Sequence, residues 1–217
     1  MTRVLVVDDH PIISEGCAQL LKAGGASQIL QAQSATEGFR LYRTQKPDLV
    51  VLDLAMRTGT LNGLSFIRGL RLHDQETPIL VFTMHSDPVI VSRALELGAT
   101  GYVLRDTSPE EFLKAFQKVR DGRPYLSYDV AADVAFKQAR EKTNPLRRLT
   151  LRELQTLALV AEGKPYRVIA DRLNVSYKTV ANTCTQLKSK LGAQTLPELM
   201  RIAIEHLPSI TRARRPD

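Results

Sequence analysis

Near the N-terminus lies a short apolar run that ends in two acids, VLVVDD (residues 4–9). Three further runs have the same character and also end in a polar residue: LVVLD (49–53), ILVFT (79–83) and GYVLR (101–105). Short apolar runs rich in β-branched residues are typical of strands that are buried on both faces of a parallel sheet. We therefore expect a parallel sheet in the N-terminal half of the chain.

The polar residues that follow these runs predict a site. In parallel sheets, ligands bind just outside the carboxyl ends of the strands. That edge would collect three carboxylates (Asp8, Asp9 and Asp53), the hydroxyl of Thr83 and the cation of Arg105. Grouped carboxylates repel one another, and Mg²⁺, which prefers oxygen ligands, removes the conflict. The set suits a phosphoryl group as well, with Asp53 as its acceptor and the hydroxyl and guanidinium as partners for its oxygens.

Helical patterns alternate with these runs as far as residue 121. They lie between Asp9 and Ile29 and over residues 35–45, 63–73, 88–97 and 108–122. Proline follows an acid or serine at two of the expected helix starts, Asp87-Pro88 and Ser108-Pro109, as is common at helix N-termini. Five strand–helix units in this length predict a doubly wound, five-stranded parallel sheet.

The rest of the chain reads differently. Residues 123–146 are interpreted as a linker that contains one helix, because a moderately helical stretch ends at Asn144-Pro145. From Thr150 onward the pattern is helical only, with capping boxes at 150–153 and 195–198. A short helix over 166–173, a tight turn and a longer helix capped by Ser176 follow one another. The tail, 209–217, is basic and polar.

Charge separates the two parts of the chain. Residues 1–125 hold fourteen Lys/Arg and fourteen Asp/Glu, whereas residues 126–217 hold sixteen and nine. The whole net charge of +7 therefore lies in the C-terminal part. This asymmetry favours a polyanionic partner for that part, although a solvated charged surface gives the same count.

Several classes of protein are disfavoured. No apolar run approaches the length of a membrane span, and a strand is expected directly after Arg3, so we expect neither a membrane segment nor a signal peptide. Cys17 and Cys184 are far apart and neither forms a CxxC pair, which argues against a metal or disulfide role. We expect a cytoplasmic protein.

The N-terminal part resembles the receiver domain of two-component response regulators over residues 1–122. Four motifs carry the resemblance: VLVVDDHP (4–11), PDLVVLDL (47–54), TMH (83–85) and ALELGATGYVL (94–104). It implies a flavodoxin-like sheet of order 2-1-3-4-5, and Asp53 as acceptor of phosphate from a sensor histidine kinase. It also implies Mg²⁺ held by Asp9, Asp53 and the backbone oxygen of Ala55, with Asp8 acting through water.

The resemblance further implies that Thr83 and Tyr102 move together after phosphorylation, although Tyr102 is equally well read as an aromatic packed at a sheet edge. Two features depart from the family pattern. Arg105 stands where the family has lysine, and arginine is larger, planar and forked. The segment 55–63 is longer than usual and lacks a proline. Both departures place ordinary phosphorylation kinetics in question.

The C-terminal part resembles the helix-turn-helix domain of the NarL/LuxR type over about residues 149–206. The motifs are LTLREL (149–154), AEGK (161–164), VIADRL (168–173), SYKTV (176–180) and KSKLG (188–192). In a helix-turn-helix the second helix enters the major groove of DNA. The residues expected to contact DNA are Tyr177, Lys178, Thr179, Ala181, Asn182, Thr185 and Lys188.

Within this set the roles divide. Lys178 and Lys188 suit phosphate contacts, and the family pattern implies that Ala181, Asn182 and Thr185 face base edges. The apolar stripe, Val180, Cys184, Leu187 and Leu191, should face the core, so that Cys184 is a small core residue rather than a redox sensor. The family often has histidine where this chain has Thr183, and a basic residue near Ala181 or Thr185. Unusual base preferences are therefore expected.

The sequence thus predicts a response regulator with a receiver (1–122), a helical linker (123–146), a LuxR-type DNA-binding domain (147–208) and a basic tail (209–217). Phosphorylation of Asp53 would free the recognition helix or favour a homodimer that binds two half-sites. The receiver would promote only its own phosphorylation and dephosphorylation, so the chain is not expected to be an enzyme. One alternative is a pseudo-receiver that binds DNA independently of phosphate, which Arg105 favours. Another is a phosphatase or phosphotransferase that uses Asp53, although such enzymes of the haloacid type need an acid where Ala55 stands.

Overall fold

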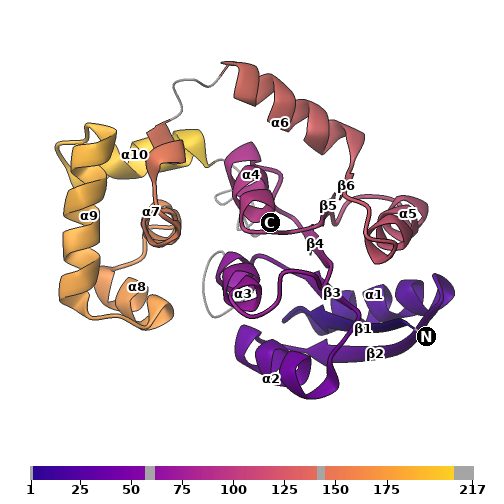
Figure 1. Ribbon diagram of the computed structural model, residues 1–217. Helices are drawn as coiled ribbons and strands as arrows, with labels where there is room; N and C mark the ends of the chain where they lie inside the picture. Colours follow the sequence, from indigo (N-terminus) through magenta and orange to yellow (C-terminus); the bar gives the residue numbers. More distant parts are fainter. Residues whose placement is uncertain (1, 57–61, 141–144, 208–217) are drawn as a thin grey trace. The chain divides into compact units, whose positions relative to one another are not determined.

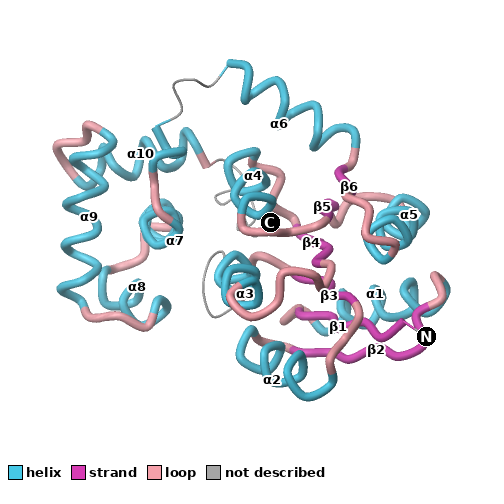
Figure 2. Tube along the Cα trace, in the orientation of Figure 1, coloured by secondary structure: helices cyan, strands magenta, loops and turns pink. Residues whose placement is uncertain are grey.

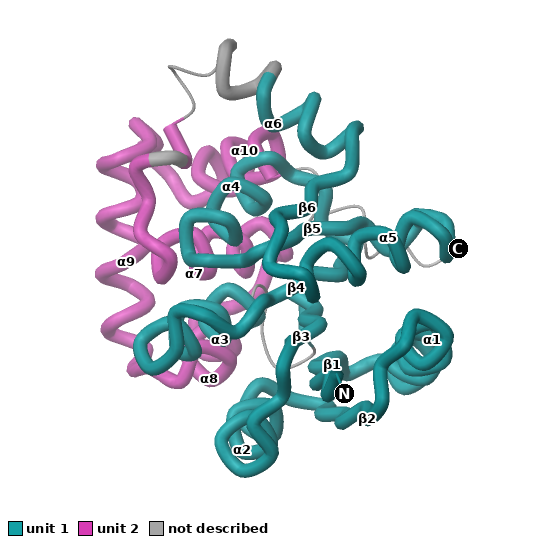
Figure 3. The backbone as a smooth tube through the Cα atoms, turned by 45° about the vertical axis from the view of Figure 1, so that its right-hand side comes forward, with its two compact units in different colours: residues 1–135 teal, residues 136–217 magenta. Residues whose placement is uncertain are grey.

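The computed structural model describes residues 2–56, 62–140 and 145–207, except for the side chains at 136–140 and 147. The chain divides into two compact units, residues 1–135 and 136–217 (Figure 3). The division falls within helix α6 (Tyr128–Arg140), which belongs to the segment interpreted as a linker. Each unit is described by itself.

The first unit contains one parallel sheet of order β2-β1-β3-β4-β5-β6. Its strands are β1 (Thr2–Val7), β2 (Ala26–Ala32), β3 (Leu49–Leu52), β4 (Ile79–Thr83), β5 (Gly101–Leu104) and β6 (Tyr125–Leu126). The predicted order 2-1-3-4-5 is confirmed. The predicted number of five strands is wrong, because the chain adds β6 beside β5. Two residues after Pro124 are too few to show the periodicity of a strand.

Five helices cover the sheet in two layers (Figure 1). They are α1 (Pro11–Ala23), α2 (Ala35–Gln45), α3 (Asn62–Arg71), α4 (Pro88–Glu96) and α5 (Pro109–Arg120). Helices α1 and α5 lie side by side, and α2, α3 and α4 form the other row. Asp87 and Ser108 cap α4 and α5 through their side chains, with proline at the start of each helix as the sequence predicts.

The core of this unit explains why the acids stay at the edge. All four residues of β3 and Val4–Val7 of β1 are buried, and β1, β3, β4 and β5 pack against Phe112, Phe116 and Val119 of α5. Strands buried on both faces have no room for charge. In β1, β3, β4 and β5, a polar side chain therefore follows the buried apolar run.

The second unit is helical (Figure 2). A short 3₁₀ turn, η1 (Pro145–Arg148), which the sequence did not predict, precedes α7 (Leu151–Ala161), α8 (Tyr166–Leu173), α9 (Tyr177–Leu191) and α10 (Leu196–His206). Thr150 and Thr195 form the predicted capping boxes, and Ser176 caps α9. Asn174 ends α8 in the left-handed conformation, which makes the tight turn between α8 and α9.

Three predictions touch residues outside the described part: the longer loop after Asp53 at 57–61, the linker break at Asn144, and the tail at 209–217. In the described part of the chain, no helix combines the length and apolar character that a membrane span requires.

Candidate functional site

The strand register brings the predicted acids together. Val7 of β1 pairs with Leu52 of β3, so Asp8 and Asp53 follow neighbouring strands at the same level. The Asp53 amide donates to the carbonyl of Val7 at 3.0 Å. Thr83 closes β4, the next strand in the sheet, and Arg105 follows β5 with its amide bonded to the Thr83 carbonyl at 3.0 Å. Asp9 directly follows Asp8. All five residues (Asp8, Asp9, Asp53, Thr83 and Arg105) thus lie at one edge of the sheet.

The carboxylates at this edge are deeply buried. Asp8, Asp9 and Asp53 are 3%, 7% and 2% exposed. In the part of the chain that the structure describes, Oδ1 of Asp53 accepts no hydrogen bond. A buried charged oxygen without a donor is costly, and this cost falls when a cation or donor reaches it.

Histidine 10 is a member of this cluster that the sequence reasoning missed. Its Nδ1 lies 2.9 Å from Asp9 Oδ1 and 3.1 Å from Asp8 Oδ1, and its amide donates to Asp8 Oδ1 at 2.9 Å. The side chain is half exposed. Its position directly after the two acids was the only available signal.

The electrostatics of Asp8 reflect crowding. Burial raises its pKa above the ordinary value of 3.8, and the nearby charge of Asp53 adds to this effect. The Arg105 guanidinium and the hydrogen bonds from His10 act in the opposite direction without cancelling it. The guanidinium of Arg105 therefore offsets only part of the effect that burial has on Asp8.

This set of groups fits a divalent cation. One ligand atom each from Asp8, Asp9, His10 and Asp53 lie within 4.8 Å of one another. Carboxylate oxygens are the ligands that Mg²⁺ prefers, and no hydrogen bond in the described part of the chain occupies the lone pairs of Asp53 Oδ1. Ala55, whose carbonyl was predicted as a further ligand, lies two residues beyond Asp53 and is half-buried.

The loop after Asp53 is closed by backbone contact. The amide of Gly63 donates to the carbonyl of Leu54 at 3.1 Å. A Cβ at Gly63 would stand 2.4 Å from the Asp53 carbonyl oxygen and 2.6 Å from Leu54 Cα. Only glycine therefore allows the start of α3 to approach the end of β3 this closely.

The predicted switch residues are both fully buried. Thr83 and Tyr102 have no exposed surface, and the Tyr102 hydroxyl donates to the carbonyl of His85 at 2.7 Å. Burial raises the pKa of Tyr102 well above its ordinary value, with Asp53 and Asp87 contributing further. The loop after β4 thus connects the two residues: Thr83 begins it and the Tyr102 hydroxyl binds it.

Helix α9 presents most of the predicted DNA-contacting residues to solvent. Tyr177, Lys178, Thr179, Asn182 and Thr185 are exposed, and Ala181 and Lys188 are half-buried. Ser176, Thr179 and Thr185 also make local hydrogen bonds. The Thr179 amide donates to Ser176 Oγ at 3.1 Å, and Thr185 Oγ1 donates to the Ala181 carbonyl at 3.1 Å.

The opposite side of α9 packs into the core. Val180, Cys184 and Leu187 are at most 1% exposed, as expected, whereas Leu191 is only half-buried. Burial raises the pKa of the Cys184 thiol, which is consistent with a packing role. Thr183 is also buried, and its hydroxyl donates to the Thr179 carbonyl at 2.9 Å.

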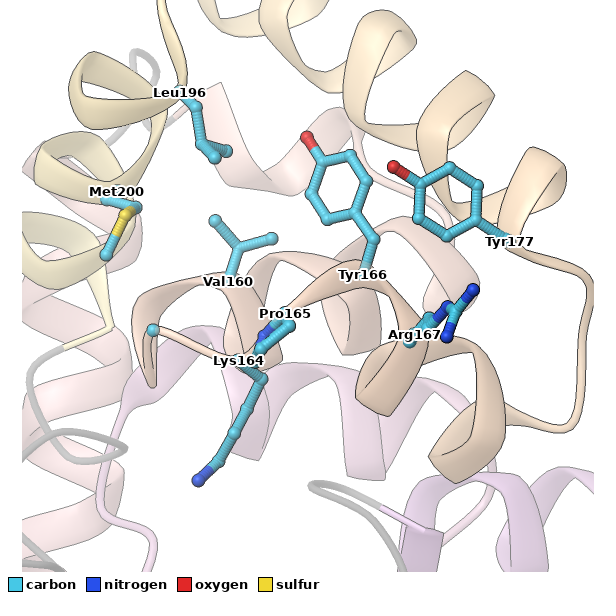
Figure 4. A pocket seen from close by; sticks show the side chains of 9 residues that line it. Val160, Lys164, Pro165, Tyr166, Arg167, Tyr177, Leu196 and Met200 are labelled. Atoms are coloured by element: carbon cyan, nitrogen blue, oxygen red, sulfur yellow. The ribbon is translucent and has the colours of Figure 1, made fainter.

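A pocket of about 620 Å³ adjoins the start of α9 (Figure 4). Val160, Leu196 and Met200 supply apolar walls, and the rings of Tyr166 and Tyr177 lie 5.9 Å apart. The pocket is also lined by two cationic residues: Lys164 and Arg167. The start of α8 thus places two cations beside the pocket that adjoins α9.

Each of the two units matches a known protein family. Residues 4–117 match the response regulator receiver domain, and residues 147–203 match the luxR family of bacterial regulatory proteins. Two relatives span nearly the whole chain. The methanol utilization control regulatory protein MoxX of Paracoccus denitrificans is 41% identical over 91% of this chain and 89% of its own. The response regulator UvrY of Escherichia coli is 30% identical over 95% of each.

Solved structures give the same result. A LuxR-family response regulator from Aurantimonas shares 36% identity with a TM-score of 0.60, over 64% of this chain and 99% of its own. Salmonella RcsB, bound to the P1flhDC promoter in the presence of the phosphomimetic BeF₃⁻, shares 25% identity with a TM-score of 0.71, over 94% and 98% of the two chains. The chain therefore belongs to the response regulators of two-component systems, the family that joins a receiver to a LuxR-type DNA-binding domain.

Proposed function

We propose that Asp53 accepts a phosphoryl group from a sensor histidine kinase, and that this modification controls binding of DNA by α9. The observation that carries the proposal is the convergence of Asp8, Asp9 and Asp53 with Arg105 at one sheet edge, with Oδ1 of Asp53 unbonded among the described residues. A nucleophile needs such a lone pair, one that no hydrogen-bond donor occupies. In the transfer, the P–N bond of a phosphohistidine breaks as a P–O bond to Asp53 forms.

Asp8, Asp9, Asp53 and the Ala55 carbonyl would hold Mg²⁺, with Asp8 acting through water. When bound, the ion would offset negative charge on the phosphoryl oxygens. Beyond promoting its own phosphorylation and dephosphorylation, the chain would catalyse no reaction.

The switch would run through the buried loop after β4. Thr83 would donate its hydroxyl to a phosphoryl oxygen, and Arg105 would pair with another. Movement of Thr83 would reach Tyr102 because both contact the short segment that ends at His85. This is a change of population between two receiver states rather than a new fold.

The output would be a homodimer on two DNA half-sites, acting in the cytoplasm. Lys178 and Lys188 would contact phosphates, together with Tyr177 and Thr179 near the helix start. Ala181, Asn182 and Thr185 would face base edges. The exposure of most of these side chains on one helix supports the assignment.

The test uses the purified full-length protein and a small phosphodonor such as phosphoramidate. We expect one phosphoryl group per chain, none in Asp53→Asn, and promoter affinity that rises about tenfold on phosphorylation, a coupling within the usual 1–3 kcal/mol. Affinity must be measured at fixed salt, because phosphate contacts make it depend steeply on ionic strength. Unchanged affinity on stoichiometric phosphorylation would refute the switch but not the DNA-binding domain.

A second candidate is a regulator that binds DNA without phosphate control. The ion pairs that Arg105 makes with Asp8 and Asp53 favour it, because they already compensate part of the charge at the site. In that case Asp53→Asn and wild-type protein would bind the promoter equally, with or without phosphodonor. Restoring lysine at position 105 would then raise the yield of acyl phosphate strongly.

A further inference from the structure

The guanidinium of Arg105 occupies a defined place inside the acid cluster. Its Nη2 forms ion pairs with Asp8 Oδ2 and, at 3.1 Å, with Asp53 Oδ2. The Arg105 side chain is 8% exposed, so these contacts are largely shielded from solvent. Its Nε approaches the Phe82 carbonyl at 3.4 Å, and its Cζ lies 5.9 Å from the centre of the Phe82 ring. Contacts on several sides thus fix the group.

These are the carboxylates that the proposed metal site also needs. A guanidinium remains charged at all ordinary pH values and is more weakly hydrated than an ammonium, so it enters a buried cluster at lower cost than lysine would. Once seated, it compensates Asp8 and Asp53 directly. A divalent cation that binds the same oxygens must take them from Arg105.

We propose that Arg105 is a built-in competitor of the divalent cation: metal binds this receiver by displacing the guanidinium from Asp8 and Asp53. Arg105 thereby lowers the metal affinity of the receiver and stabilises its metal-free form. The inference rests on the proposed magnesium site and adds a regulation of that site. Arg105 is a positioning residue in this role, because it acts through the two carboxylates.

The first test compares full-length Arg105→Gln with wild-type protein in MgCl₂ titrations at constant ionic strength, followed by calorimetry. Glutamine removes the charge and keeps a polar side chain. We expect the apparent Kd for Mg²⁺ to fall about tenfold, which corresponds to ~1.4 kcal/mol. In EDTA the same variant should melt at a lower temperature than wild type, and Mg²⁺ should raise its melting temperature by a larger increment.

The matched control is Arg123→Gln. Arg123 belongs to the same unit but is exposed and pairs with Asp121 at 3.2 Å. Its removal should leave the Mg²⁺ affinity unchanged. A conservative variant, Arg105→Lys, should fall between wild type and Arg105→Gln.

A second test needs no substitution and therefore does not depend on the folding of a variant. The side-chain Nε–H signal of Arg105 in ¹H–¹⁵N NMR spectra of wild-type protein should shift with Mg²⁺, with the same Kd as the calorimetric titration. A signal that stays in place at saturation would overturn the displacement.

The outcomes separate the two proposals. Mg²⁺ binding by wild-type protein, with equal or weaker affinity in Arg105→Gln, would overturn the competitor and leave the metal site intact. No Mg²⁺ binding by wild type or either Arg105 variant throughout the titration would overturn the metal site and the competitor together.

Discussion

Both units bury carboxylates, but they surround them differently. In the helical unit, Glu153 is 5% exposed, and its Oε2 accepts from the Thr150 amide at 2.9 Å and from Lys190 Nζ at 2.8 Å. Burial acts to raise the pKa of Glu153, yet the hydrogen bonds from Lys190 and Thr150 hold it below the ordinary 4.5. At the receiver edge, burial prevails and the pKa of Asp8 is raised.

This difference separates a structural role for Glu153 from the environment of the receiver carboxylates. Glu153 has enough donors to be stable as an anion, so it joins α7 to α9 and completes a helix cap. In the receiver, Asp8 and Asp53 both pair with the single guanidinium of Arg105. A buried charge with satisfied partners stabilises a fold, whereas a group left short of partners retains free energy for binding a ligand.

The largest effect is expected on removal of Glu153. Glu153→Ala should lower the free energy of unfolding of the helical unit by about 1–3 kcal/mol, because it removes a cap and a charge-assisted hydrogen bond. Urea unfolding followed by circular dichroism measures it. Glu205→Ala, which removes only the exposed pair with Arg201, is the control and should cost about 0.3 kcal/mol. If both variants lost the same free energy of unfolding, the buried contacts of Glu153 would contribute no more than an exposed ion pair.

At the receiver edge, removal of a carboxylate is expected to raise the free energy of unfolding rather than lower it. Asp53→Asn should stabilise the metal-free protein by about 1 kcal/mol, since it relieves repulsion among buried carboxylates. Melting in EDTA measures this gain, and saturating Mg²⁺ should abolish it. Destabilisation in EDTA would mean that Arg105 already satisfies the acids fully.

The smallest effects concern pH. The lowered pKa of Glu153 contributes stability that is present above 4.5 and lost as the pH falls through the folded-state value. The raised pKa of Asp8 contributes stability that is present below 3.8 and lost as the pH rises through its folded-state value. Acidification from about pH 7 should therefore weaken the helical unit while favouring the metal-free receiver edge.

Calorimetry of Glu153→Gln and Asp8→Asn in EDTA isolates the two contributions. Each substitution should flatten the pH dependence of one unit by a few tenths of a kcal/mol and leave the other unchanged. If either substitution changed the pH dependence of stability equally in both units, the assignment of these contributions to Glu153 and Asp8 would be wrong.

Much of this arrangement was predictable from sequence because strand ends carry the signal. Apolar runs fix which residues are buried, and parallel register then aligns Asp8 with Asp53. Side-chain partnerships across long separations were not predictable. The strand ends place Arg105 at the same edge as the acids but do not say which of them it pairs with, and the pairing of Lys190 with Glu153 depends on how helices pack, which no periodicity encodes. The two-residue strand β6 was missed for a related reason, since its pairing is wholly non-local.

The contact of Gly63 with the end of β3 bears on the segment 55–63, which the sequence comparison with the receiver pattern predicts to be longer than usual. The Gly63 amide and the Leu54 carbonyl tie the two ends of that segment together. Because the ends of the segment are joined, a longer segment mainly costs loop-closure entropy. Doubling the length of a flexible loop costs only about 0.6 kcal/mol. Added residues at this point are thus inexpensive, and the carboxylate of Asp53 at the end of β3 can keep its place whatever the length of the segment.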